Sequence, residues 1–150
     1  MVVMPKERLR VVRLHSDAKL PSYGSCGAAG ADLYACLEEP LTIGPGQSGW
    51  VPTGIALEIP EGYAGLIYAR SGLACKHGLA PANKVGVVDS DYRGQVMVVL
   101  YNHSNEERVI SNGERIAQLL ITPVLTPDFV FADTLAASER DDGGFGSTGI

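Results

Sequence analysis

Short apolar runs, each closed by Gly, Pro or Asn, dominate the chain, whereas helical periodicity is scarce. Runs of this kind are typical of β-strands separated by turns. The turn signals recur about every 8–12 residues, which indicates an all-β sandwich or barrel. The pattern predicts strands over residues 10–14, 31–37, 41–43, 50–59, 63–69, 85–89, 95–101, 115–123 and 129–132.

One short helix is predicted near the middle of the chain. Ser71 can cap its first turn, residues 73–77 can form it, and Gly78 can end it. Further along, the polar segment 90–94 separates two apolar runs and is a candidate hairpin. The sequence contains neither an internal repeat nor an interdomain linker, so we expect residues 1–150 to form a single domain.

Composition and charge narrow the classes of function. The 150 residues suit one domain that buries about two thirds of the surface of its unfolded chain. The net charge of −5 argues against general binding to nucleic acid or a membrane surface, so a polyanionic ligand would need locally concentrated arginines or a metal cation. Three widely spaced cysteines favour free thiols in a reducing compartment. Because no apolar run has transmembrane length and no signal-peptide pattern is present, a cytoplasmic protein is expected.

The last ten residues, DDGGFGSTGI, are rich in glycine and contain one aromatic residue, Phe145. Such a stretch has little to bury and a large backbone ordering cost, so it cannot build a core. Its bare backbone N–H groups and the hydroxyls of Ser147 and Thr148 can surround phosphate oxygens. We expect residues 135–150 to be a flexible arm that orders over a phosphorylated ligand, with Phe145 laid on a ring; a disordered terminus is the alternative.

Two further segments carry residues suited to nucleotide chemistry. In ARSGLA, Arg70 ends a strand and Ser71 and Gly72 open a helical turn, which together can bind phosphate; an ordinary capped turn is the alternative. In GVVDSDYRGQV, Asp89 lies at the rim of a sheet, where a carboxylate can hold and deprotonate a water. Tyr92 lies at the bend and can bracket a small ligand, although an acidic turn is a common element between strands.

Two apolar strands carry isolated polar residues. Asp32 in AGADLYA needs a partner or a role if its side chain is buried. GERIAQL places Arg115 and Gln118 on one strand, and Gln118 can hydrogen-bond a phosphate oxygen or a water. For both segments the alternative is a polar residue satisfied within a sheet.

The segments AGADLYA, ARSGLA, GVVDSDYRGQV, GERIAQL and RDDGGFGSTG resemble, in order and spacing, the five motifs of the deoxyuridine triphosphatases (dUTPases). The resemblance spans residues 29–149. It implies an all-β jelly roll or distorted β-barrel that assembles as a homotrimer, with each active site shared between subunits. It also implies hydrolysis of dUTP to dUMP and pyrophosphate with Mg²⁺ on the triphosphate, which lowers dUTP and supplies dUMP for thymidylate synthesis.

The resemblance also implies roles for individual residues. Asp89 matches the acid that activates the attacking water, and Tyr92 matches the residue that stacks beneath deoxyribose. Asn83 and the neighbouring backbone match the uracil reader, and Asp32 matches the acid near metal-bound waters. The matches to phosphate or arm contacts are Arg70, Ser71, Gly72, Gln118, Arg140, Phe145, Gly146, Ser147 and Thr148.

Departures from the family pattern leave these assigned residues in place. Gly72 stands where the family often has a second Ser, and Asp141 stands where it often has Gly, which adds charge beside Arg140. A dCTP deaminase has a similar motif order, but its catalytic Glu would fall near Val99, which is aliphatic. A non-catalytic nucleotide sensor and a jelly-roll module that binds sugars or proteins are the remaining alternatives.

Overall fold

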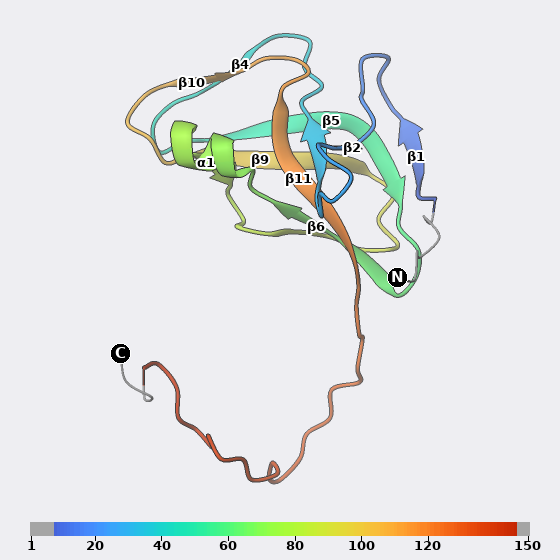
Figure 1. Cartoon of the computed structure of the whole chain (residues 1–150), viewed down its shortest axis with the longest axis vertical. Helices are drawn as coiled ribbons and strands as arrows, with labels where there is room; N and C mark the ends of the chain where they lie inside the picture. The colour runs from blue at the N-terminus through green and yellow to red at the C-terminus, as the bar shows by residue number, and fades with distance from the viewer. Residues whose placement is uncertain (1–7, 147–150) are drawn as a thin grey trace.

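The computed structural model describes residues 8–146, which form a β-sheet protein with one short helix (Figure 1). The strands are β1 (Arg10–Arg13), β2 (Ser22–Tyr23), β3 (Ala31–Tyr34), β4 (Leu41–Ile43), β5 (Ser48–Glu58), β6 (Tyr63–Tyr68), β7 (Leu79–Pro81), β8 (Gly86–Val88), β9 (Gln95–Asn102), β10 (Arg108–Ile110) and β11 (Arg115–Pro123), and the helix is α1 (Ser71–His77). Antiparallel pairing orders them as β1-β5-β9-β7, β2-β3-β11-β6-β8 and β10-β4. The all-β prediction is confirmed, and the arrangement is that expected of a jelly roll.

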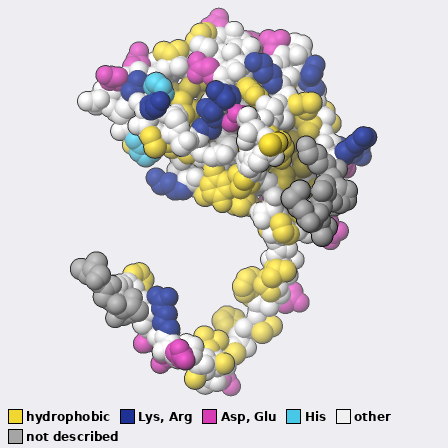
Figure 2. All heavy atoms as spheres, in the orientation of Figure 1, with side chains coloured by type: hydrophobic (Ala, Val, Ile, Leu, Met, Phe, Trp, Pro, Cys, Tyr) yellow, Lys and Arg dark blue, Asp and Glu magenta, His cyan; other side chains and the backbone are white. Residues whose placement is uncertain are grey.

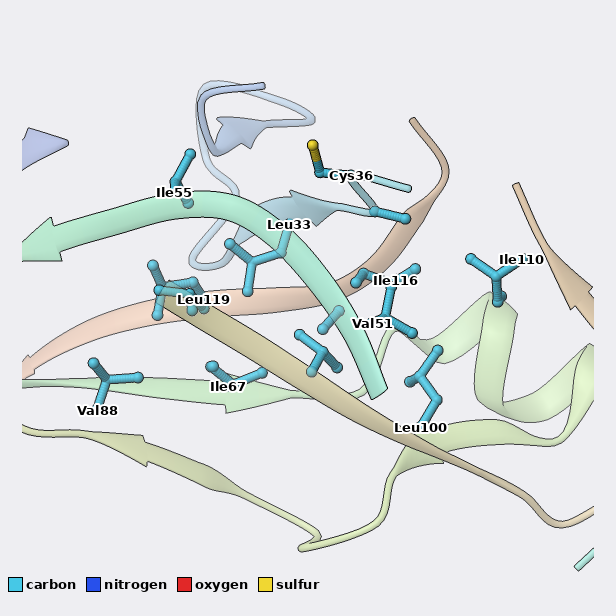
Figure 3. Close-up of a cluster of buried hydrophobic side chains, with 14 of the residues drawn as sticks. Leu33, Cys36, Val51, Ile55, Ile67, Val88, Leu100, Ile110, Ile116 and Leu119 are labelled. Atoms are coloured by element: carbon cyan, nitrogen blue, oxygen red, sulfur yellow. The ribbon is translucent and has the colours of Figure 1, made fainter. Parts of the chain in front are cut away.

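The core lies between the two larger sheets, where β5 and β9 face β3, β6 and β11 (Figure 3). Alternation along β9 buries every second residue, including Val98 and Leu100. Leu33 on β3 and Ile116 on β11 meet them with no exposed surface. Each large apolar side chain buried in this way contributes about 1.5–3 kcal/mol. These contacts hold the two large sheets against each other, and the cavities described below are formed by residues at their margins.

Asn102, at the end of β9, is a buried polar residue whose side chain is fully bonded. Its Nδ2 donates to the carbonyl oxygens of Ile43 at 2.9 Å and Glu106 at 2.7 Å. Its Oδ1 accepts from the backbone N–H of Ser104 at 2.9 Å and from the Ser104 hydroxyl at 2.7 Å. Because a buried amide without partners would cost free energy, this complete set of bonds makes Asn102 the tie between β4, β9 and the loop that follows.

The helix ends as predicted but begins differently. Gly78 has a left-handed φ of 68°, and its N–H donates to the carbonyls at the end of the helix. The N-cap is Arg70, whose backbone is extended, and no side chain caps the first turn, so the prediction that Ser71 caps the helix is wrong. Ser71 is itself the first helical residue, and only a residue with non-helical dihedrals can act as N-cap.

The predicted hairpin around residues 90–94 is also wrong. β8 pairs with β6, whereas β9 pairs with β5 and β7, so the two strands belong to different large sheets. The intervening segment crosses from one sheet to the other. The sequence pattern also missed β2, β7 and β10, which have only two or three residues each.

After β11 the chain leaves the body and runs away from it (Figure 1). The strand predicted over residues 129–132 is wrong, because this segment has no strand partner within residues 8–146. Apolar side chains gather along it (Figure 2), and five of them are at least 85% exposed: Leu125, Phe129, Val130, Phe131 and Leu135. In the described part of the chain, no helix is long and apolar enough to cross a membrane.

Candidate functional site

The first candidate cavity, of about 270 Å³, lies where β8 and β9 separate into their two sheets. Asn83, Asp89 and Tyr92 border it, together with apolar residues of β6, β8 and β9. Trp50 on β5 also lines the cavity and is 68% exposed, so it is not a core residue. The cavity therefore combines an amide, a carboxylate and two aromatic rings in one place.

Tyr92 is held in this cavity by its own segment. Its hydroxyl donates to the backbone carbonyl of Gln95 at 2.9 Å, and its backbone N–H donates to the carbonyl of Asp89 at 3.2 Å. A Cβ at Gly94 would lie 2.6 Å from Cζ of the Tyr92 ring, so only glycine lets the ring occupy this position. The Gln95 side chain is engaged elsewhere, since its Oε1 accepts the backbone N–H of Gly54 at 2.8 Å.

Asp89 immediately follows β8, at the sheet rim where the sequence places it. It is exposed, and its carboxylate takes part in none of the ion pairs formed among residues 8–146. A carboxylate without an ion-pair partner is free to accept a proton or a hydrogen bond from a bound water.

Asn83 lies on a tight turn at the edge of the same cavity. The backbone N–H of Lys84 donates to Pro81 at 3.0 Å, and the N–H of Val85 donates to Asn83 at 2.8 Å. Lys84 has a φ of 68°, which few residues other than glycine adopt. Gly86 lies next to the Asn83 amide, because a Cβ at this glycine would be 3.5 Å from Asn83 Nδ2. The turn thus aims the Asn83 side chain along the cavity wall.

The second candidate cavity, of about 240 Å³, lies on the outer face of β3 and β11, beside the start of α1. Its polar lining consists of Asp32, Arg70, Ser71, Arg115 and Gln118, with Gly24, Ala28, Gly30 and Gly72 completing the wall. The small residues leave backbone accessible, and the two guanidinium groups suit an anionic ligand.

Asp32 has the partners that its burial requires. Its Oδ1 lies 2.8 Å from Arg70 Nε and its Oδ2 lies 3.5 Å from Arg115 Nη1. Gln118 is paired with Asp32 across the sheet, and its Nε2 donates to the Ala69 carbonyl at 2.8 Å. This bond uses one of the two N–H donors of the Gln118 amide, and Oε1 lies beside Gly30.

The two cavities share no lining residue in this chain. The described arm residues, 135–146, line neither cavity: Arg140 donates through Nε to the carbonyl of Gly143 at 2.6 Å, and Phe145 is fully exposed. Gly146 is also exposed, while Ser147 and Thr148 lie outside the described residues. The single chain therefore brings together Asn83, Asp89 and Tyr92, and separately Asp32, Arg70, Ser71, Gly72 and Gln118.

Among the polar and aromatic residues of these cavities, three had no role from the sequence. Trp50 and Gln95 line the first, and Arg115 lines the second. Arg115 stands on the same predicted strand as Gln118, but residues three apart on a regular strand face opposite sides, so the sequence does not place the two side chains together. Among residues 8–146 no group of three or more His, Cys, Asp and Glu side chains is arranged to hold a metal ion.

A β-protein with one cavity bordered by aromatic and amide groups and another lined by arginines fits the class of nucleotide-binding proteins. Residues 16–149 match the dUTPase family model. The deoxyuridine 5'-triphosphate nucleotidohydrolase of Desulfitobacterium hafniense is 49% identical over 146 residues, which are 97% of this chain and 97% of that protein. The protein of the same name from Hydrogenobaculum sp. is 48% identical and covers 95% of this chain and 99% of its own length.

Solved structures agree with these relatives. A point mutant of the Staphylococcus bacteriophage 80alpha dUTPase, determined with dUpNHpp, has a TM-score of 0.88 and 28% identity and covers 97% of this chain and 100% of that one. A point mutant of the dUTPase from phage phi11 of S. aureus, described with a structural Mg(II) ion, has a TM-score of 0.77 and 25% identity and covers 85% of this chain and 98% of that one. This chain belongs to the dUTPase family.

Proposed function

We propose that this protein hydrolyses dUTP to dUMP and pyrophosphate in the cytoplasm, which lowers dUTP and supplies dUMP for thymidylate synthesis. The observation that carries the proposal is the cavity between β8 and β9, where Asp89, Asn83 and Tyr92 come together. The family membership of the chain agrees with it.

Asp89 is the general base in this proposal. Its exposed carboxylate at the end of β8 accepts a proton from the water that attacks the α-phosphorus of the substrate. The oxygen of that water forms the new P–O bond, and the bond from the α-phosphorus to the oxygen that bridges it to the β-phosphorus breaks, so pyrophosphate leaves. Help of this kind from a positioned base contributes about 10²–10⁴-fold.

Selectivity for deoxyuridine comes from the same cavity. Asn83 and the backbone around it bind the edge of uracil, and the adjacent wall leaves no room for a methyl group. The Tyr92 ring lies beneath the sugar, where its fixed position excludes a 2′-hydroxyl. Support for this fixed position comes from the Tyr92–Gln95 hydrogen bond and from the ring's close packing on Gly94.

The second cavity binds the triphosphate. Arg70, Ser71, Gly72 and Gln118 line it and supply charged, hydroxyl and backbone groups for phosphate oxygens. In the same proposal, Arg140 neutralises the terminal phosphate and Phe145 covers uracil. Gly146, Ser147 and Thr148 complete the phosphate cage when the arm closes.

A homotrimer with shared active sites explains why the pieces lie apart in one chain. The base cavity and the phosphate cavity share no residue, and the chain after β11 extends away from the β-sheet body (Figure 1). The exposed apolar side chains between residues 125 and 135 need a surface to cover them. A neighbouring subunit supplies that surface and receives the arm. Sedimentation equilibrium measures the mass: about three chains per particle support the assembly, and a monomer contradicts it.

Mg²⁺ is the proposed cofactor, and the described residues fit an indirect role for it. Both carboxylate oxygens of Asp32 face arginines, so this acid would reach the ion only through water. Phosphate oxygens of the substrate and water molecules would then be the direct ligands of the ion, as is usual for Mg²⁺ on nucleotides. When bound, the ion neutralises charge on the phosphates, whereas the residues named above orient the substrate and take the proton.

A substrate panel tests the proposed function. Pyrophosphate release is measured from dUTP, dTTP, dCTP and UTP with and without Mg²⁺. We expect rapid release from dUTP alone and loss of turnover without the metal. Ammonia released from dCTP would instead support a deaminase, and tight dUTP binding without turnover would support a nucleotide sensor.

A further inference from the structure

We propose that Arg115 is a second phosphate-binding arginine of the dUTP site, positioned there by Asp32 together with Arg70. The inference rests on the proposed function and extends it to a residue that the dUTPase motifs did not lead us to assign. Asp32 lies on β3, Arg115 on the neighbouring strand β11, and Arg70 between β6 and α1, and all three line the second cavity.

One carboxylate holds both guanidinium groups by different oxygens. Arg70 uses Nε on Asp32 Oδ1, which leaves both of its terminal nitrogens free of this ion pair. Arg115 uses only Nη1 on Oδ2. Two positive charges and one negative charge leave a net charge of +1 on the cavity wall. The remaining N–H groups are donors for phosphate oxygens, since a guanidinium carries five N–H donors.

An irregularity in the β3–β11 ladder places Arg115 on the cavity side. Asp32 lies opposite Gln118 and Leu33 opposite Ala117, but Tyr34 lies opposite Arg115, so the register shifts at this point. Ile116 and Ala117 are consequently both buried, where regular alternation would bury only one of them. Without the shift, Arg115 would point toward the core. β-Bulges that redirect a side chain are common beside active sites.

The ion pair between Arg115 and Asp32 is too weak to make stabilising the fold the main role of Arg115. The two atoms are 3.5 Å apart and the Arg115 side chain is 53% exposed, whereas Arg70 is closer and only 26% exposed. Exposed ion pairs of this kind add little to folding stability. Arg115 also borders the larger hollow of about 590 Å³ beside α1, where Arg70 and Lys76 outnumber the single acid, Glu114, so its remaining donors face an open region with excess positive charge.

Binding of two separate probes tests the role of Arg115. Inorganic tripolyphosphate represents the anionic part of the substrate, and deoxyuridine represents the part bound in the base cavity. Affinities for both are measured as inhibition constants against dUTP hydrolysis, and by calorimetry, for the wild-type protein, Arg115→Gln and Arg115→Lys. The matched control is Arg10→Gln. Arg10 forms an exposed ion pair with Glu58, with 3.0 Å between the two charged atoms, and it lines neither cavity.

We expect Arg115→Gln to weaken tripolyphosphate binding about tenfold or more, which corresponds to about 1.4 kcal/mol, while deoxyuridine affinity stays unchanged. Arg115→Lys should retain part of the affinity, and Arg10→Gln should retain all of it. Equal tripolyphosphate affinity in Arg115→Gln and wild type would overturn the inference, as would a parallel loss for both probes. Wild-type protein that binds tripolyphosphate in an Arg115-dependent way yet releases no pyrophosphate from dUTP would overturn only the proposed function.

Discussion

Replacing Gly94 by alanine should displace the Tyr92 ring without unfolding the protein, and so tests what the position of the ring contributes to selectivity. The added Cβ would lie 2.6 Å from Cζ and 2.9 Å from Cε2 of the ring, which real Cβ atoms do not tolerate. Tyr92 is 46% exposed, so the ring can swing toward solvent and the backbone need not move. The expected result is a folded protein whose base cavity has lost one wall.

The energies favour a change in selectivity over unfolding. Displacing the ring breaks the hydrogen bond from the Tyr92 hydroxyl to Gln95, which costs about 0.5–1.5 kcal/mol. Alanine in place of glycine lowers the conformational entropy of the unfolded chain, which raises the free energy of unfolding by about 0.4–1 kcal/mol. The two effects nearly cancel, so we expect the melting temperature to change by no more than about 4 °C.

The assay compares kcat/KM for dUTP and UTP in Gly94→Ala and in the control Gly27→Ala, whose added Cβ would meet nothing within 4 Å. We expect the preference for dUTP to fall about tenfold or more in the first variant, because the sugar is no longer bounded by a fixed ring. The control should keep the preference of the wild type. Unchanged discrimination in a well-folded Gly94→Ala protein would refute the role of the ring position.

Three other substitutions test the site and the fold. Asp89→Asn should leave dUTP binding near that of the wild type and lower kcat by about 10²–10⁴-fold in pyrophosphate release; normal turnover would remove Asp89 as the base. Asn102→Ala should lower the free energy of unfolding by about 3 kcal/mol in urea, because it leaves buried backbone groups without partners, whereas the exposed Asn112→Ala should lower it by about 1 kcal/mol or less. Burial, reinforced by the negative charge of Asp17, raises the pKa of the Cys36 thiol above its ordinary value of 9.0. The folded protein therefore keeps this proton while the unfolded chain loses it, so between about pH 8 and about pH 10 the wild type should lose more stability than Cys36→Ala; equal losses in both would contradict the shift.

The strands that form the core were readable from the sequence because their own residues alternate. β9 and β11 appear at or close to their predicted bounds, and Asp89 follows β8 at the rim as expected. Gly78 marks the end of the helix because its left-handed backbone favours glycine at that position. These features depend on local spacing and local backbone conformation.

Features that depend on distant partners were not readable. The sequence of residues 85–101 contains no signal that β8 and β9 belong to different sheets. The apolar run at residues 129–131 has a strand-like composition, but within the described chain it has no partner. The register shift beside Ile116 is likewise set by packing of that residue in the core, and it decides which way Arg115 points. For the catalytic and substrate-binding residues, the sequence supplied assignments that still await the experiments above.

The separation of the base cavity from the phosphate cavity has a consequence for mixtures of chains. If each active site combines residues from different subunits, a substitution in one subunit also impairs active sites that it shares with its neighbours. A variant altered at Asp89 would lose the function of the base cavity, which is one half of each site, whereas a variant altered at Arg70 would lose the function of the phosphate cavity, which is the other half. Their co-assembly would regenerate some intact pairs of halves, so the mixture would be more active than either parent.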